Sequence, residues 1–252
     1  MYKRRTLSVI IPAYNEEKKI SDVLKSLVNS SLIDEIIVIN DGSSDNTLSI
    51  IKKYKKVLLI NLKDNHGKGY AITKGVQKAK GDIMIFLDAD LTGLDNTHIR
   101  KFFDLLILGK NRVVIGYSNN IKTDKLFLPL SGQRAYWKKD LIPYLKEISE
   151  KGYGLELYLN YIFKEKKIKL FLLKGVKNSL KYEKQTYDMV AKLFLIESFD
   201  ILSEILKQQN PISYLLKSYL YSFYIKKPKK NSNQIDKLIK YIKNNLIQKI
   251  QE

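Results

Sequence analysis

Residues 83–90 read Ile-Met-Ile-Phe-Leu-Asp-Ala-Asp, and this stretch decides the fold. An uninterrupted apolar run of this length predicts a strand that is buried on both faces of a parallel sheet. The acids that end the run are then expected at the carboxyl edge of the sheet, where open α/β folds bind their ligands. Alternate strand residues share a face, so Asp88 and Asp90 can converge on one divalent cation. A solvated turn is the simpler alternative for an isolated pair of this kind.

Strand and helix patterns alternate around this stretch. Strands are predicted at residues 7–12, 35–39, 57–60 and 82–87, and each is followed by a helical pattern, the fourth at 97–108. Beyond it we expect strands at 113–117 and 168–173 and a loop that runs into a strand at 127–137. The pattern predicts an α/β fold: a Rossmann-like, mostly parallel sheet with helices on both faces and its strand-to-helix loops on one edge.

The composition indicates a globular protein with a strong positive charge. The chain has 252 residues, 44% of them hydrophobic, no cysteine and a formal net charge of +19. Without cysteine it can form neither a disulfide nor a thiolate metal site. No segment resembles a signal peptide or a membrane-spanning helix, so we expect a cytoplasmic protein. The charge fits nucleic acid, an anionic membrane surface or phosphorylated ligands, but a compositional drift toward lysine explains it equally well.

Three loops on the predicted edge carry polar residues suited to a nucleotide. In the first, Tyr14 and Glu16 stand beside a helix start whose free N–H groups attract anions. In the second, Asp41 is placed to accept the imino hydrogen of a base. In the third, Lys68 lies between two glycines, as expected at a phosphate or at the rim of a base site. Taken singly, a capped helix, an Asp-Gly turn and a surface turn explain these loops as well.

The order of these pieces resembles the family 2 glycosyltransferases with a GT-A fold. Tyr-Asn-Glu-Glu after a prolyl strand end, Asp-Gly-Ser-Ser-Asp, Gly-Lys-Gly and Phe-Leu-Asp-Ala-Asp follow one another, and the likeness covers about residues 6–175. It implies a nucleoside pocket, a nucleotide loop and a metal on the diphosphate of a sugar nucleotide. The residues implied are Pro12, Tyr14 and Glu16 at the nucleoside, Asp41 at the base, Gly67 and Lys68 near the nucleotide, and Asp88 with Asp90 on Mg²⁺ or Mn²⁺.

The region after the acid pair shapes the sugar and acceptor pocket in this family. The resemblance assigns Ser131, Gly132, Gln133 and Gly154 to that pocket, with Gln133 bonding sugar hydroxyls. Arg134 is our candidate for a second cation at the departing diphosphate, and a surface arginine is the alternative. Glu156 resembles the acid with which many inverting members deprotonate the acceptor. An acid in a helix first turn, however, is often only a partner of the helix dipole.

Narrower resemblances point in two directions. The chain is similar to dolichyl-phosphate sugar synthases, whereas the string at 152–157 is similar to glucosyl-3-phosphoglycerate synthases, which retain anomeric configuration and need no base. The stereochemical outcome therefore stays open. Those synthases also carry a histidine metal ligand further on, where this chain offers Asn178, Lys181 or nothing. We expect His66 at the surface and His98 in a helix first turn.

The end of the chain is basic and amphipathic. From residue 207 onward it carries ten lysines and two acids. Such helices can lie on an anionic membrane surface, or they can pack on the core or on a second subunit with their lysines solvated. We expect a GT-A domain at 1–183 and a basic helical extension at 184–252.

These features together predict a metal-dependent hexosyltransferase that uses a nucleotide-diphosphate sugar, with UDP-glucose favoured by resemblance. The expected acceptor is a polyprenyl phosphate or other lipid, or a small phosphorylated metabolite. A sugar-phosphate nucleotidyltransferase is one alternative, although it would carry a longer glycine-rich first loop. The other is a non-catalytic membrane or nucleic-acid adaptor on the same fold. For the enzyme no nucleic-acid partner is expected, and peripheral membrane binding and homo-oligomerisation stay open.

Overall fold

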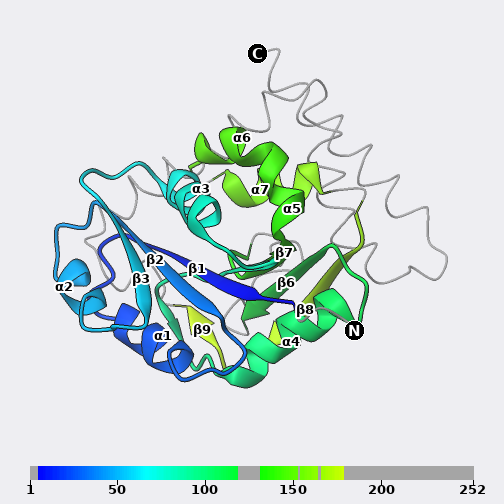
Figure 1. Ribbon diagram of the computed structural model, residues 1–252, viewed down its shortest axis with the longest axis horizontal. Helices are drawn as coiled ribbons and strands as arrows, with labels where there is room; N and C mark the ends of the chain where they lie inside the picture. The colour runs from blue at the N-terminus through cyan, green and yellow to red at the C-terminus, as the bar shows by residue number, and fades with distance from the viewer. Residues whose placement is uncertain (1–4, 119–130, 153, 164–165, 179–252) are drawn as a thin grey trace, which may run out of the picture.

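A mixed seven-stranded sheet forms the centre of the computed structural model (Figure 1). The model describes residues 5–118, 131–152, 154–163 and 166–178. The strands are β1 (Leu7–Ala13), β2 (Glu35–Asp41), β3 (Val57–Leu62), β4 (Ile83–Phe86), β6 (Val113–Ser118), β7 (Arg134–Trp137) and β8 (Ile168–Leu173), in the spatial order β3-β2-β1-β4-β7-β6-β8. The predicted boundary at 183 and the helical extension lie outside the described residues.

The sheet is mostly parallel, as predicted. Strands β1 to β4 run parallel to one another, and β6 pairs in parallel with β8. Strand β7 is antiparallel to both β4 and β6, with Ile85 opposite Ala135 and Arg134 opposite Ile115. This antiparallel insertion, which the sequence pattern did not predict, brings the segment from residue 131 alongside the end of β4.

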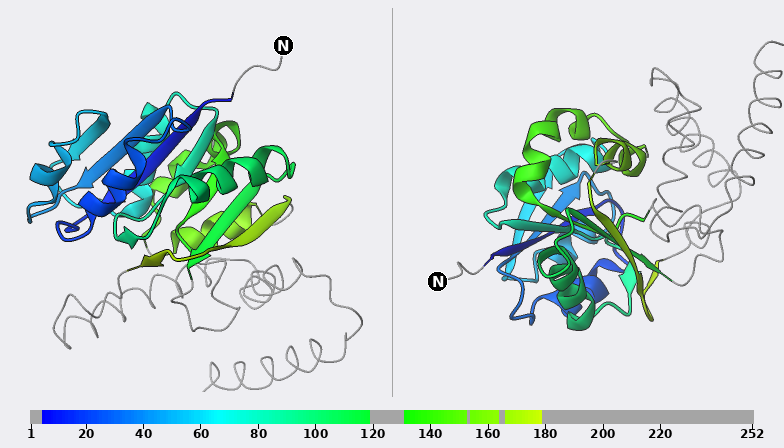
Figure 2. Two further views of the ribbon diagram at one scale, coloured as in Figure 1. Left: turned by 90° about the horizontal axis from the view of Figure 1, so that it is seen from below. Right: turned by 90° about the vertical axis from the view of Figure 1, so that its right-hand side faces the viewer.

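Helices cover both faces of the sheet (Figure 2). They are α1 (Ile20–Leu27), α2 (Thr47–Ile51), α3 (Lys68–Lys78), α4 (Asn96–Ile107), α5 (Lys138–Leu141), the 3₁₀ turn η2 (Ile142–Tyr144), α6 (Leu145–Ser149) and α7 (Leu155–Ile162). Helices α1, α2 and α4 pack on one face, and α3, α6 and α7 on the other. In the part of the chain that the structure describes, no helix is long and apolar enough to cross a membrane.

Two buried clusters hold these layers together. Consecutive residues of each central strand enter opposite clusters, because strand side chains alternate between the faces. In β4, Ile83 and Ile85 join the α1 and α4 side, whereas Met84 and Phe86 join the α3 and α7 side. All four are at most 1% exposed. The apolar run is therefore a strand buried on both faces, as its sequence predicts.

Candidate active site

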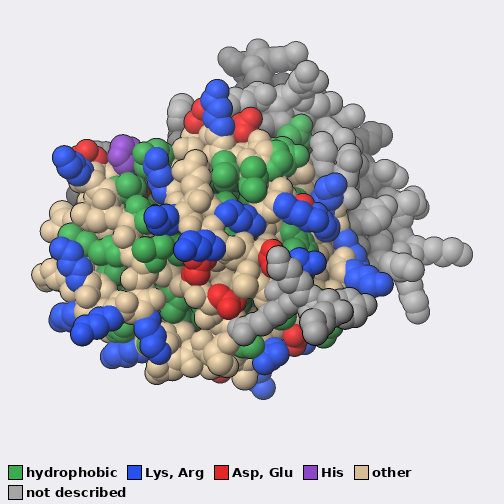
Figure 3. Space-filling view, in the orientation of Figure 1, with side chains coloured by type: hydrophobic (Ala, Val, Ile, Leu, Met, Phe, Trp, Pro, Cys, Tyr) green, Lys and Arg blue, Asp and Glu red, His purple; other side chains and the backbone are tan. Residues whose placement is uncertain are grey.

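A cavity of about 720 Å³ opens at the edge where β1, β2 and β4 end. Its lining residues are Pro12, Ala13, Tyr14, Glu16, Asp41, Asn65, His66, Gly67, Lys68, Asp88, Ala89, Asp90, Gly132, Gly152, Glu156 and Asn178. Ten of the sequence-predicted site residues are therefore gathered around one space. Figure 3 shows acidic side chains lying beside lysines on the face that it draws.

The acid pair reaches the cavity from a turn rather than from the strand itself. Strand β4 ends at Phe86, and Ala89 and Asp90 lie in a turn beyond it. The sequence predicted that Asp88 and Asp90 converge because alternate strand residues share a face. Both do line the cavity, but this reason is wrong, because they lie beyond the end of the strand. The two-stranded ribbon of β5 (Leu91–Thr92) and β9 (Lys177–Asn178) follows at once and brings Asn178 to the same space.

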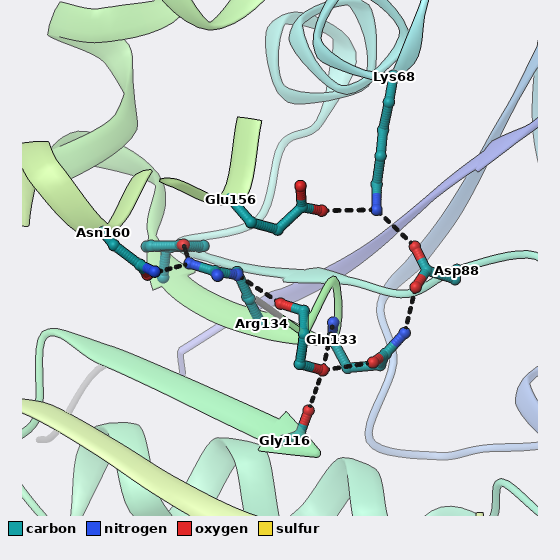
Figure 4. A network of polar contacts seen from close by, with 9 residues as sticks. Lys68, Asp88, Gly116, Gln133, Arg134, Glu156 and Asn160 are labelled. Carbon is teal, nitrogen blue, oxygen red and sulfur yellow. Dashed lines mark hydrogen bonds and ion pairs between the residues drawn. The ribbon is translucent and has the colours of Figure 1, made fainter. Parts of the chain in front are cut away.

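Lys68 joins two carboxylates across the cavity (Figure 4). Its Nζ lies 2.7 Å from Asp88 Oδ1 and 2.8 Å from Glu156 Oε1. Helix α3 begins at Lys68, and Glu156 stands in the first turn of α7. Burial by itself would lower the pKa of Lys68, but the charges of Asp88 and Glu156 outweigh it and raise that pKa above its ordinary value. The lysine therefore stays charged at any physiological pH.

Gly132 leaves room for this charged cluster. A Cβ atom at this position would lie 2.6 Å from Lys68 Nζ and 2.7 Å from each carboxylate oxygen of Asp88. Real Cβ atoms essentially never approach other atoms this closely, so a larger residue would have to displace the pair. The glycine that the resemblance placed in the sugar pocket thus sets the space beside Asp88.

Asp41 ties the second loop to the third. Its carboxylate oxygens accept hydrogen bonds from the backbone N–H groups of His66 and Gly67, at 2.9 and 2.8 Å. Gly67 adopts a φ of 91°, a left-handed conformation that glycine tolerates best. Asp41 is 3% exposed and lines the cavity. Its contact with a base stays a prediction, and the structure shows that it also shapes the nucleotide loop.

The first loop is held against the second at the rim of the cavity. The N–H of Asn15 donates to Ser43 Oγ at 3.0 Å, and that of Glu16 donates to Thr47 Oγ1 at 2.7 Å. Tyr14 is 49% exposed beside these bonds, an unusual position for a large aromatic ring in a folded chain. An exposed ring at the mouth of a polar cavity is suited to contact with a flat ligand.

Arg134 lies beneath the cavity and does not line it. Its guanidinium donates to the carbonyl oxygen of Ser131 at 2.7 Å and to Asn160 Oδ1 at 2.9 Å, and the residue is only 1% exposed. A surface arginine, the alternative considered from sequence, is excluded by this burial. Its predicted action on a departing diphosphate stays a prediction. Ser131 and Gln133 are also buried outside the lining, and Gly154 is the N-cap residue of α7.

Several lining residues were not predicted from sequence. Asn65, Gly152 and the two alanines carried no chemical signal of their own, and His66, which is exposed as expected, also lines the cavity. The ring of His66 stacks on that of Tyr70, with centroids 4.5 Å apart. Its position directly before Gly-Lys-Gly was the signal that could have placed it at the cavity. His98 stands in the first turn of α4, as expected.

The donor set suits a hard divalent cation only in part. Among the described residues no group of three or more His, Cys, Asp or Glu side chains gathers to hold a metal. Asp88 and Asp90 nevertheless offer carboxylate oxygens at one cavity, and Mg²⁺ commonly takes one or two carboxylates together with substrate phosphates and water. The residues present therefore fit a cation that arrives with a phosphorylated ligand.

Residues 8–169, more than half of the chain, match the family model for glycosyl transferase family 2. The chain belongs to this family. The match covers β2, β4 and nearly all of β1, whose ends meet at the cavity, and it ends within β8, before β9. The family and the GT-A type of fold expected from the loop motifs are thus confirmed.

Curated relatives of family 2 cover only part of the chain. It is 33% identical to the dolichyl-phosphate beta-glucosyltransferase ALG5A of Trichomonas vaginalis over 126 residues, which are 44% of this chain and 39% of that protein. It is 38% identical to the dolichyl-phosphate beta-glucosyltransferase of Drosophila melanogaster over 99 residues, 33% of this chain and 30% of that protein. The chain therefore spans well under half the length of these relatives.

A solved structure shares the fold over a longer stretch. The glucosyl-3-phosphoglycerate synthase of Mycobacterium tuberculosis, crystallised with Mn²⁺, UDP and glucosyl-3-phosphoglycerate, superposes with a TM-score of 0.64. The sequence identity is 23%, and the match covers 79% of each chain. At this identity the likeness supports the fold.

Proposed function

We propose that this chain is a metal-dependent glycosyltransferase that moves a hexose, with glucose favoured, from a UDP-sugar to a phosphorylated acceptor. One observation carries the proposal: Lys68, Asp88 and Glu156 meet in a cavity that is built from the strand-end loops of a family 2 fold. The relatives named above are glucosyltransferases, and the synthase of similar fold was crystallised with UDP, which supports the choice of donor.

The donor would bind along the strand-end loops. Pro12, Tyr14 and Glu16 are proposed to contact the nucleoside, and buried Asp41 to accept a hydrogen bond from the base. The N–H groups at the start of α3 and the charge of Lys68 favour the diphosphate. A donor diphosphate in this position would compete with Asp88 and Glu156 for the lysine.

Asp88 and Asp90 would hold Mg²⁺ or Mn²⁺, which supplies charge neutralisation for the departing diphosphate when it is bound. Asp88 Oδ1 accepts a hydrogen bond from Lys68 and Oδ2 accepts one from Gln133, and both oxygens are of the hard type that such a cation prefers. Both known metals of the synthase of similar fold, Mn²⁺ and Mg²⁺, prefer oxygen ligands of this kind.

Glu156 is the proposed acceptor-side residue. For an inverting reaction it would take the proton of the acceptor hydroxyl or phosphate, and its ion pair with Lys68 holds the carboxylate in the cavity. For a retaining reaction it would instead orient the sugar. Its side chain is 13% exposed and faces the cavity, which suits either role.

The acceptor is proposed to be a lipid phosphate or a small phosphorylated metabolite. The Trichomonas and Drosophila relatives carry dolichyl phosphate in their names, whereas the mycobacterial synthase was crystallised with phosphoglyceric acid. Liposome flotation of the full chain and of a version that ends at Gln208 tests membrane association. Equal binding of the two to anionic vesicles would remove the basic C-terminal region as the membrane contact.

The test of the proposed function is hydrolysis of UDP-glucose in the presence of Mn²⁺. The wild-type chain should release UDP, and both EDTA and Asp90→Asn should reduce the rate by about a hundredfold or more. The control is Asp22→Asn, which changes an acid on α1 away from the cavity and should leave the rate unchanged. Activity that is indifferent to Asp90, or absent with every sugar nucleotide, would favour the adaptor alternative.

A further inference from the structure

Gln133, to which the family resemblance assigns a contact with sugar hydroxyls, is a buried polar residue outside the cavity lining. It is 1% exposed, stands directly before β7 and does not line the cavity. A side-chain amide at this depth requires partners for its N–H₂ and its oxygen, because burying either without a hydrogen bond is costly. The hydrogen-bond partners of the Gln133 amide therefore indicate its role.

The amide of Gln133 contacts Asp88 on one side (Figure 4) and Ser131 on the other. Nε2 donates to Asp88 Oδ2 at 2.5 Å, and Oε1 lies 2.6 Å from the hydroxyl oxygen of Ser131. That hydroxyl oxygen is also 2.5 Å from the carbonyl oxygen of Gly116 in β6. An ionised carboxylate only accepts hydrogen bonds, so the amide must turn its nitrogen toward Asp88 and its oxygen toward Ser131.

Asp88 is consequently held from two sides. Lys68 binds Oδ1 through a long, flexible side chain from α3, and Gln133 binds Oδ2 through a short, buried one next to β7. The backbone beneath Gln133 is fixed in turn, since Arg134 Nε donates to the carbonyl oxygen of Ser131 at 2.7 Å. When a diphosphate draws Lys68 away, the bond from Gln133 continues to orient the carboxylate.

We propose that Gln133 is a positioning residue for the cation site, which orients the Asp88 carboxylate through Nε2 and is itself oriented by Ser131. The inference rests on the proposed function, since it concerns the same Asp88. It assigns Gln133 a task other than contact with sugar hydroxyls. Residues that hydrogen-bond to metal ligands commonly change metal affinity by 10- to 100-fold when they are replaced.

The test is the affinity for Mn²⁺ alone and with UDP, measured by the electron paramagnetic resonance signal of free Mn²⁺. Gln133→Met keeps the volume but cannot donate a hydrogen bond, and it should raise the Kd for Mn²⁺ about tenfold or more. Ser131→Ala should raise it by a smaller factor. The double variant should be no worse than Gln133→Met, because Ser131 acts on Asp88 only through Gln133.

The control is Thr73→Val, which removes another buried hydrogen bond, from Thr73 Oγ1 to the carbonyl oxygen of Leu145, without touching the cavity. It should leave the Kd for Mn²⁺ unchanged. Circular dichroism and thermal unfolding establish which variants are folded. If Gln133→Met does not fold, Ser131→Ala decides the matter, because loss of Mn²⁺ affinity in that variant supports the proposal and unchanged affinity overturns it.

The outcomes separate this inference from the proposed function. If the wild-type chain binds Mn²⁺ and folded Gln133→Met binds it equally well, the positioning role is overturned, whereas the cation site itself is supported. If the effects of Gln133→Met and Ser131→Ala on the Kd for Mn²⁺ are strictly additive, the claim that Ser131 acts through Gln133 is overturned. If the wild-type chain binds no Mn²⁺ with or without UDP, the cation site and the inference fall together.

Discussion

At the scale of single residues, Gly132 shows how the absence of a methyl group shapes a charged site. Alanine at this position would place its Cβ 2.7 Å from both Asp88 oxygens. We expect Gly132→Ala to weaken binding of UDP with Mn²⁺ about tenfold, because overpacking costs about 1–3 kcal/mol and 1.4 kcal/mol is a factor of ten. Isothermal titration would measure this. An unchanged Kd would show that the carboxylate moves aside at no cost.

Glu156 gives the second prediction at this scale. We expect Glu156→Gln to lower the rate of sugar transfer by about a hundredfold, the lower end of what a general base contributes, with a Kd for UDP within about threefold of wild type. The matched control is Glu150→Gln, an exposed acid beyond α6 that lies outside the cavity. A transfer rate within a few fold of wild type would remove Glu156 as the base and favour the retaining outcome.

At the scale of the elements, helix α4 depends on a carboxylate cap. Asp95 Oδ1 accepts hydrogen bonds from the N–H groups of Thr97 and His98, and Asp95 N–H donates to His98 Nδ1 at 3.2 Å. The hydrogen bond from the Thr97 hydroxyl is the main cause that lowers the pKa of Asp95 below 3.8. Because the folded pKa is the lower one, the cap stabilises the protein above pH 3.8 and loses this effect as the pH falls through the folded value.

We therefore expect Asp95→Ala to lower the free energy of unfolding by about 1 kcal/mol at pH 7, as for other caps. The difference from wild type should shrink as the pH is lowered below 3.8. Urea unfolding at a series of pH values measures both effects. A difference that stays constant down to pH 3 would contradict a role for the carboxylate charge.

The strands and helices that depend on local pattern could be predicted from sequence. Strand β4 and its parallel neighbours follow from continuous apolar runs, and α1 follows from the spacing of its buried residues. A strand at the end of residues 127–137 was predicted and is β7, but its antiparallel direction could not be, because the direction of a strand leaves no mark in four residues. The short helices around Pro143 were missed because none is long enough to show a period.

The candidate site likewise contains features that could be predicted from sequence and features that could not. Residues with distinctive chemistry, such as Asp41, Lys68 and Asp88, could be predicted. Each stands at or next to the end of a predicted strand or the start of a predicted helix. The burial of Arg134 and the direction of the Gln133 amide could not. Both depend on partners far along the chain, namely Asn160 and Asp88, and no local pattern encodes such contacts.

At the scale of the whole molecule, every described residue that lines the cavity lies in the first part of the chain. Its lining residues run from Pro12 to Asn178, whereas ten of the lysines behind the net charge of +19 lie from residue 207 onward. We therefore expect a version that ends at residue 183 to bind UDP with Mn²⁺ as the full chain does, within about threefold in Kd, because it keeps all of the described lining residues.

Isothermal titration of both versions would measure the two Kd values. As a control, Asp41→Ala in the shorter version should abolish the binding of UDP, because it removes a lining carboxylate and both of its hydrogen bonds to the nucleotide loop. A large loss of UDP affinity on shortening would mean that residues beyond 183 complete the donor site. In that case the predicted division into two parts would be wrong. Unchanged UDP binding with a lost rate of transfer would instead place the acceptor contact in the basic region.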